Sequence, residues 1–292
     1  MKSVVALGNF DGVHRGHHHL LKAAVAVGIK EKLTCIAWTF EKHPKNLLAG
    51  ECITKQIMTN DMKYELIRYI GVDKVVFADF EKVKDLSCEE FVDKVLVQEL
   101  SAAHVFCGEN YTFGKKAAGD AKKLRQLCES RGIKVTIIPI LQSSGTDVCS
   151  TRIRTLIEQG EVEQANLLLL QRFFIRGEVL KGNKIGSKYN MPTINMVIPH
   201  DIVKPKSGVY FSKTVADGES YVSLTNIGTR PTVGGTEENM ETHIIGYHGN
   251  LYGKIIDVHL LKYHRGEKKF DSLDELFRQI EKDIEDRKKW NG

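Results

Sequence analysis

Cysteine is sparse in this sequence and shows no pairing pattern. The six cysteines stand singly at positions 35, 52, 88, 107, 128 and 149, and none forms a C-x-x-C pair. The spacing therefore gives no sign of a disulfide framework. We expect reduced thiols, several of them buried in strands and helices, in a cytoplasmic protein.

Long apolar runs and a strong excess of charge are also lacking. No stretch approaches the roughly 20 apolar residues that cross a membrane. The first apolar run ends at Gly8, which is too short for the core of a signal peptide. The 42 basic and 37 acidic residues give a net charge of +5, which suits anionic small molecules but is too dispersed to predict nucleic-acid binding. We expect a monomer or a weak homo-oligomer, with no membrane or nucleic-acid partner.

A glycine-rich stretch near the N-terminus is the most informative part of the sequence. Residues 8–17 read Gly-Asn-Phe-Asp-Gly-Val-His-Arg-Gly-His, between an apolar run at 4–7 and a helix-like segment at 20–27. A strand, a glycine-rich turn and a helix start form an anion site, because N–H groups and the positive end of the helix dipole face the turn. His14 and His17 can add donors to charge that develops on a phosphate.

The spacing of these residues selects one motif. It matches neither the Walker A loop nor G-x-G-x-x-G. Residues 14–17 match H-x-G-H, the motif of nucleotidyltransferases that attack the α-phosphate of a nucleoside triphosphate. Two alternatives stay open. The stretch can be a helix-capping loop with two surface histidines, or the histidines at 14, 17, 18 and 19 can bind a metal ion, although no cysteine or carboxylate lies at ligand spacing.

The order of apolar segments predicts two domains of different architecture. To about residue 171, strands and helices alternate, which predicts a parallel sheet covered by helices on both faces, with ligands at the carboxyl ends of its strands. From about residue 172, six strand-like segments follow one another, which predicts an antiparallel six-stranded β-barrel. The length of 292 residues suits two globular domains. We therefore predict domains at 1–171 and 172–292.

A single helix is predicted to close the chain. It begins at a capping box of Ser272 and Glu275. Its apolar stripe is expected to pack against the barrel, and consists of Leu273, Leu276, Phe277, Ile280 and Ile284. Between two of the predicted strands, Asp217-Gly218 predicts a hairpin turn.

Three further strings lie where the first sheet is expected to bind ligands. Residues 39–44 (Thr-Phe-Glu-Lys-His-Pro) follow the second predicted strand, residues 108–114 (Gly-Glu-Asn-Tyr-Thr-Phe-Gly) follow another, and residues 150–154 (Ser-Thr-Arg-Ile-Arg) open a helix. Two hydroxyls, N–H groups and an arginine at a helix start suit a triphosphate. Each string also has an ordinary alternative, namely an N-cap at Ser150 or Thr151, a turn at His43, and core aromatics at Tyr111 and Phe113.

With these strings, the first half resembles the FMN adenylyltransferase module of prokaryotic FAD synthetases, a Rossmann-like nucleotidyltransferase domain. All four strings fall in the order of the family. The resemblance implies that the adenylyl group of ATP is transferred to FMN, with Mg²⁺ present, and that FAD and pyrophosphate are released. The residues implied are His14, His17 and Arg154 in catalysis, Gly8, Asn9, Phe10, Gly16, Ser150 and Thr151 in ATP binding, and Asn110 and His43 in FMN binding.

The second half resembles the riboflavin kinase module of the same bifunctional proteins. The matching strings include residues 192–195 (Pro-Thr-Ile-Asn), 226–232 (Asn-Ile-Gly-Thr-Arg-Pro-Thr) and 241–243 (Glu-Thr-His). The resemblance implies conversion of riboflavin and ATP to FMN and ADP. It implies that Thr193 and Asn195 bind Mg²⁺ and that Glu241 takes the proton of the riboflavin 5′-hydroxyl. Contacts to nucleotide or flavin are implied for Gly182, Gly186 and Arg265.

The sequence departs from the family mainly in the segment before Pro192. Ser187, Asn190 and Met191 stand where arginine, glycine and phenylalanine are expected. Loss of the arginine removes a bidentate contact that a lysine does not replace. Two interpretations stay open. The barrel phosphorylates riboflavin, or it is retained without turnover and the chain is a monofunctional FMN adenylyltransferase. In the first half, Asn110 stands where the family usually has aspartate.

Three other classes share part of this pattern. A sugar- or lipid-head-group cytidylyltransferase has H-x-G-H but not the flavin-module strings. A class I aminoacyl-tRNA synthetase also uses the motif, but this chain has no basic tract for tRNA. A flavin-binding protein without activity would not need His14, His17 and Arg154. The nucleotide separates the classes, because ATP and not CTP should support product formation.

Overall fold

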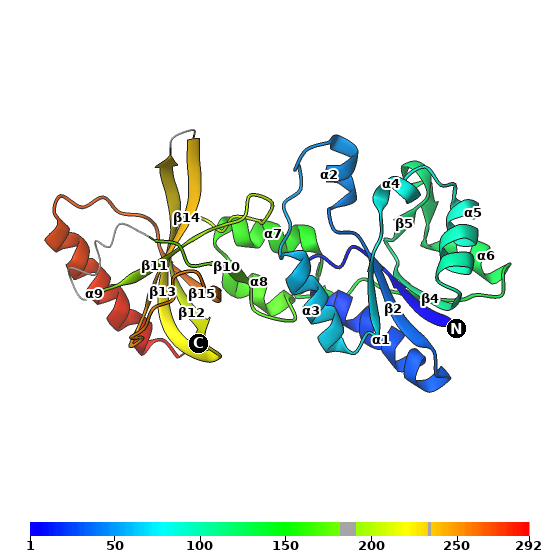
Figure 1. The fold of residues 1–292 in the computed structure, drawn as a ribbon, viewed down its shortest axis with the longest axis horizontal. Coiled ribbons are helices and arrows are strands. Elements are labelled where there is room, and N and C mark those ends of the chain that lie inside the picture. The colour runs from blue at the N-terminus through cyan, green and yellow to red at the C-terminus, as the bar shows by residue number, and fades with distance from the viewer. Residues whose placement is uncertain (182–190, 233–234, 292) are drawn as a thin grey trace. The chain divides into compact units, whose positions relative to one another are not determined.

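The computed structural model describes residues 1–181, 191–232 and 235–291. The chain forms two compact units, Met1–Arg152 and Ile153–Gly292. Helix α7 (Ser150–Gln159) begins in the first unit and ends in the second. Each unit has its own sheet (Figure 1). The functional boundary at residue 171 stays a prediction.

The first unit is built on a five-stranded parallel sheet with the order β3-β2-β1-β4-β7. Its strands are β1 (Ser3–Leu7), β2 (Thr34–Thr39), β3 (Lys74–Phe77), β4 (Ala102–Gly108) and β7 (Lys134–Ile138). The direction of winding reverses between β1 and β4, and ligands of such sheets bind at the carboxyl ends of the strands at this switch point. The predicted parallel sheet is confirmed, and the glycine-rich turn leaves β1 at the switch point.

Helices cover both faces of this sheet (Figure 1). Helix α1 (Arg15–Glu31) contacts β1, β2 and β4, and also contacts α3 (Asn60–Ile70). On the face to which Val5 and Leu7 point, the core includes α5 (Cys88–Glu90), the π-helix η1 (Phe91–Glu99) and α6 (Ala121–Glu129). The shorter elements are α2 (Pro44–Ala49), α4 (Phe80–Val83), η2 (Lys115–Ala117), the pair β5 (Thr112–Phe113) and β6 (Gly119–Asp120), and the hairpin of β8 (Gln142–Ser143) and β9 (Thr146–Asp147).

The second unit is an antiparallel six-stranded sheet with the order β10-β15-β12-β13-β14-β11, preceded by α8 (Val162–Leu168). Its strands are β10 (Phe174–Glu178), β11 (Thr193–Val197), β12 (Gly208–Ala216), β13 (Glu219–Thr232), β14 (Gly235–Ile244) and β15 (Ile255–Arg265). The two edges nearly meet, because the Leu180 N–H donates to the Asn195 carbonyl at 2.8 Å. The predicted barrel is confirmed. So is the hairpin turn, where Asp217 and Gly218 both have positive φ.

The barrel interior contains a chain of buried hydroxyls among apolar side chains. The Ser212 hydroxyl bonds to those of Ser223 and Thr225 at 2.8 Å, and Thr225 bonds to Thr242 at 2.9 Å. None of these four residues is exposed. Because every hydroxyl has a partner, the chain can be buried without the cost of an unsatisfied polar group.

The closing helix α9 (Leu273–Lys289) begins as predicted, with the Glu275 N–H donating to the Ser272 hydroxyl at 3.2 Å. Its predicted apolar stripe is wrong at Leu273, which is 51% exposed. Phe277 is buried, but so are the charged residues Asp283 and Arg287. Their burial is possible because each has polar partners on the barrel, which the helical periodicity alone did not show.

Candidate active sites

The glycine-rich turn between β1 and α1 is held in a tight conformation. Phe10 and Val13 have positive φ angles of 49° and 35°, and that of Gly12 is 79°. A Cβ atom at Gly12 would lie 2.8 Å from the side chain of Ile57, so a larger residue does not fit. Positive φ at two non-glycine residues stores strain, and such strain persists only where the surrounding structure imposes it.

Three hydrogen bonds attach this turn to neighbouring segments. The Ile57 N–H donates to Asp11 Oδ1 at 2.9 Å, and the Thr39 hydroxyl donates to the Asn9 carbonyl at 2.9 Å. The Ser150 hydroxyl donates to the Asp11 carbonyl at 2.8 Å. The turn therefore meets the end of β2 and the start of α7, which carry two of the three other predicted strings.

His14 and His17 lie side by side at the start of α1. Their rings stack with centroids 3.5 Å apart and planes at 18°. His14 is the N-cap, and its Nδ1 accepts from the His17 N–H at 3.2 Å, which assigns the proton of the neutral ring to Nε2. Since His14 is only 6% exposed, it is not a surface histidine, although it caps the helix as the alternative interpretation predicts.

Burial controls the charge of both imidazoles. It lowers the pKa of His14 to about 4. Burial also lowers the pKa of His17, and the nearby His14 and Lys63 lower it further. Near pH 7 both rings are therefore neutral hydrogen-bond donors and not cations. Within the described residues, the buried Nδ1 of His17 has no hydrogen-bond partner, a cost of about 1–3 kcal/mol that an oxyanion ligand could offset.

His43 and Asn110 follow β2 and β4. His43 is the N-cap of α2, where its Nδ1 accepts from the Lys45 N–H at 3.2 Å. Asn110 is exposed. The structure therefore gives His43 a capping role, and the contacts of both residues with FMN stay predictions. Of the aromatics in the same string, Phe113 is buried and Tyr111 packs against the same core, as their ordinary alternative predicts.

The start of α7 carries residues 150–154. Ser150 is bonded to the glycine-rich turn, and Thr151 is exposed. The Arg152 guanidinium donates to three carbonyl oxygens of the β8–β9 hairpin at 3.1–3.4 Å, so it holds this hairpin. Arg154 lies two residues further along α7, in the second unit. Its contact with phosphate stays a prediction.

Lys63 on α3 is a candidate residue that the sequence analysis missed. Its side chain is 2% exposed, and Nζ donates to the Phe40 carbonyl at 2.8 Å. Burial lowers the pKa of Lys63 to about 8, while Asp11 and Glu41 act in the opposite direction. The sequence signal was a lysine among the buried positions of an amphipathic helix, which are Met62, Lys63, Ile67 and Ile70.

In the barrel, polar side chains of three neighbouring strands form one row. Asn195 on β11 pairs with Glu241 on β14, and Glu241 pairs with Asn226 on β13. Paired residues of antiparallel strands share a face, with Cβ atoms about 4.5–5.5 Å apart. Thr193 shares this face because it lies two residues before Asn195. Asn239 Nδ2 donates to Glu241 Oε1 at 3.1 Å.

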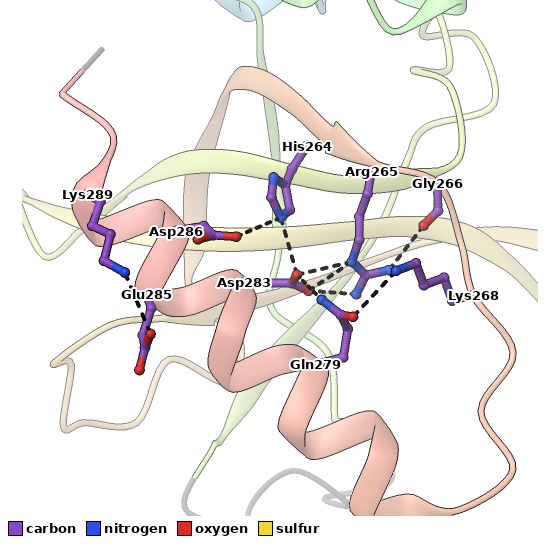
Figure 2. A network of polar contacts seen from close by, with 9 residues as sticks. All are labelled: His264, Arg265, Gly266, Lys268, Gln279, Asp283, Glu285, Asp286 and Lys289. Carbon is purple, nitrogen blue, oxygen red and sulfur yellow. Dashed lines mark hydrogen bonds and ion pairs between the residues drawn. The ribbon is translucent and has the colours of Figure 1, made fainter.

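Arg265 binds the closing helix α9 (Figure 2). Its Nε and one terminal nitrogen donate to Asp283 Oδ2 at 3.0 and 2.6 Å. His264 and Gln279 contact Oδ1 of the same carboxylate at 3.2 and 2.8 Å, so its burial is compensated. This network gives Arg265 a structural role, and its contact with nucleotide or flavin stays a prediction. Gly182 and Gly186 lie outside the described residues.

The described residues lack two further kinds of feature. In residues 1–181, 191–232 and 235–291, no group of three or more histidine, cysteine, aspartate or glutamate side chains could hold a metal ion. Over the same residues, every helix is too short or too polar to cross a membrane.

Known proteins match both units. The FAD synthetase family model matches residues 1–152, and the riboflavin kinase model matches residues 169–291. The bifunctional riboflavin kinase/FMN adenylyltransferase of Bacillus subtilis (strain 168) is 32% identical over 97% of this chain and 90% of its own length. The protein of the same name from Escherichia coli (strain K12) is 33% identical over 96% of this chain and 90% of its own.

A solved structure matches across both units. The crystal structure described as a macrolide-efflux protein from Streptococcus pneumoniae is 29% identical, with a TM-score of 0.90, over 99% of this chain and 95% of that one. The two family matches fall in the order of the two units, and the relatives match nearly the full length. The chain therefore belongs to the family of bifunctional riboflavin kinase/FMN adenylyltransferases.

Proposed function

We propose that the first half transfers AMP from ATP to FMN and releases pyrophosphate. The observation that carries this proposal is the stacked, neutral pair of His14 and His17 at a helix start, on the turn at the switch point of the sheet. A phosphate oxygen of FMN attacks the α-phosphorus of ATP in line, and the bond from this phosphorus to the bridging oxygen of pyrophosphate breaks. The imidazole N–H groups stabilise the charge that develops on the α-phosphate and the leaving group.

Positioning supplies most of the catalysis in this scheme, because no protein nucleophile is needed. The glycine-rich turn provides backbone N–H groups close to the phosphates. In the proposed site, Gly8, Asn9, Phe10 and Gly16 surround ATP, Ser150, Thr151 and Arg154 hold its β- and γ-phosphates, and Asn110 and His43 contact FMN. The bond from Ser150 to the Asp11 carbonyl supports this arrangement, since it joins two of these segments.

For the second half, we propose phosphorylation of riboflavin by ATP. Glu241 takes the proton of the riboflavin 5′-hydroxyl while the hydroxyl oxygen attacks the γ-phosphorus of ATP. The bond from this phosphorus to the bridging oxygen breaks, and ADP leaves. Thr193 and Asn195 would hold Mg²⁺, and their oxygen donors fit this hard cation. When bound, Mg²⁺ neutralises charge on the phosphates of ATP. The register that places Asn195 opposite Glu241 supports this site.

An assay of the purified chain tests both halves. FMN with ATP and Mg²⁺ should give FAD, and riboflavin with ATP and Mg²⁺ should give FMN, both followed by chromatography. CTP in place of ATP is the control for a cytidylyltransferase. Absence of FAD would overturn the first proposal. Absence of FMN alone would identify a monofunctional FMN adenylyltransferase with an inactive barrel.

The remaining assignments follow from these activities. We place the adenylyltransferase in residues 1–171 and the kinase in residues 172–292. The six cysteines are free, four of them buried, which suits the reducing cytoplasm. We expect a monomer or a weak homo-oligomer without nucleic acid, and sedimentation of the full chain would check this.

A further inference from the structure

We propose that Lys63 is a positioning residue of the adenylyltransferase site, whose ammonium group holds the end of β2 against the glycine-rich turn. The inference rests on the proposed FAD synthesis and adds a residue to it. Lys63 matches none of the motifs in the sequence, and it enters the site only through the packing of α3.

The contacts of Lys63 point to the site and not to solvent. Its side chain is 2% exposed, in a helix otherwise packed by apolar residues. Nζ donates to the Phe40 carbonyl at 2.8 Å and lies 5.4 Å from the centroid of the Phe77 ring. Phe40 directly follows Thr39, whose hydroxyl holds the Asn9 carbonyl of the turn. Lys63 therefore binds the residue next to Thr39, and Thr39 binds the turn.

The charges around Lys63 belong to the same segments. Asp11 lies in the turn and Glu41 follows Phe40, and both favour its charged form. On α1, burial lowers the pKa of His17, and the charge of Lys63 lowers it further. A buried cation is costly unless it has such partners, so a lysine at this place needs a reason beyond packing. The reason we infer is that one ammonium group links α3, the end of β2 and the turn.

The charge of Lys63 gives the inference its test. Burial lowers the pKa of Lys63 to about 8 from its usual 10.5, so the ammonium form is present below about pH 8 and is lost above it. The neutral amine is a weaker donor to the Phe40 carbonyl and no longer attracts Asp11. Activity should therefore fall as the pH rises through about 8. An arginine stays charged across this range and should remove the fall.

The experiment measures FAD formation by the full chain between pH 6.5 and 9.5, as kcat/KM for FMN at saturating ATP and Mg²⁺. It compares wild type with Lys63→Arg, Lys63→Met and the control Lys74→Met, which replaces an exposed lysine at the start of β3. At pH 7 we expect Lys63→Met to lose roughly tenfold to a hundredfold, the range of a hydrogen bond to a charged group. We expect Lys63→Arg to retain most activity and to lack the decline near pH 8, while Lys74→Met keeps it.

Each outcome bears on one claim. Wild type without FAD formation contradicts the proposed function itself. If wild type is active, a decline near pH 8 that persists in both Lys63→Arg and Lys63→Met overturns the inference, and so does Lys63→Met within about twofold of wild type at pH 7. Thermal unfolding of the variants identifies loss of fold. If Lys63→Met unfolds, the pH profiles of wild type and Lys63→Arg decide alone.

Discussion

The two candidate sites of this chain are built in different ways. In the first unit, the turn between β1 and α1 is strained and largely buried, and hydrogen bonds attach it to segments that are distant in the sequence. In the barrel, Asn195, Glu241 and Asn226 stand in one row because their strands pair in register. The first site depends on tertiary contacts, whereas the second depends on strand alternation and pairing.

The polar groups of the two sites also differ in their exposure to solvent. Burial sets the chemistry of the first site, since it keeps His14 and His17 neutral as donors. The row in the barrel includes the exposed Glu241, whose role depends on what covers it when substrate is bound. We therefore expect variants in the first site to affect catalysis through packing and charge, and variants in the row to act on single groups.

The largest expected effect is in the barrel. Glu241→Gln should lower riboflavin phosphorylation by roughly 100- to 10,000-fold, because the general base is lost, and should leave FAD formation from FMN unchanged. The measurement is FMN formation from riboflavin and ATP. Glu219→Gln, at an exposed glutamate of β13, is the control. Phosphorylation near the wild-type rate in Glu241→Gln would remove Glu241 from this role.

The next effect is in the first unit. His14→Ala and His17→Ala should each lower FAD formation by about 100- to 1,000-fold, comparable to loss of an oxyanion donor. Riboflavin phosphorylation by the same samples should not change, which keeps the two sites separate. The control is His19→Ala, since His19 is exposed on the same helix. Steady-state FAD formation at the wild-type rate in both variants would contradict the assignment.

The network around Asp283 tests the second unit through its stability and not through its activity. Asp283→Ala leaves the partly buried Arg265 without its carboxylate and should destabilise the second unit by about 3 kcal/mol. The control is Asp286→Ala, which removes a partly exposed carboxylate 3.9 Å from His264 and should cost less than about 1 kcal/mol. Calorimetric unfolding measures both. Equal effects of the two variants would contradict the structural role of the Arg265–Asp283 pair.

The smallest effect concerns the attachment of α7 to the turn. Ser150→Ala removes one hydrogen bond worth about 1 kcal/mol, so kcat/KM for ATP should fall about fivefold in FAD formation. Ser130→Ala serves as the control, because the Ser130 hydroxyl bonds only to neighbouring groups at the end of α6, donating to the Leu127 carbonyl and accepting from Arg131. An unchanged kcat/KM in Ser150→Ala would mean that the turn keeps its position without α7.

Much of the fold could be predicted because its signals are local. The alternation of strands and helices predicted the parallel sheet, and the run of strands predicted the barrel. The turn at Asp217-Gly218 followed from its residue types, since both positions need positive φ. The prediction that Leu273 packs against the barrel was wrong. Periodicity shows which residues share a face of the helix, but not how far along the helix the barrel extends.

The candidate sites were predicted in part. Motif strings identified the glycine-rich turn and the polar residues of the barrel, but Lys63 matched no motif. The partner of Arg265 was also missed, because Asp283 lies 18 residues further along the chain on a helix expected to present an apolar stripe. Lys63 and Asp283 are both charged and buried. The sequence alone does not show which charged side chains find partners in the interior.

By itself, the sequence determined the order of elements, the two architectures and the strings predicted to carry phosphate chemistry, because apolar periodicity, turn types and motif spacing are properties of neighbouring residues. The tertiary structure alone decided the protonation of His14 and the burial of Lys63. It also brought the glycine-rich turn and the start of α7 together, through a hydrogen bond between residues 139 positions apart. The physical reason is that desolvation and hydrogen bonding depend on which distant segments exclude water from the same place.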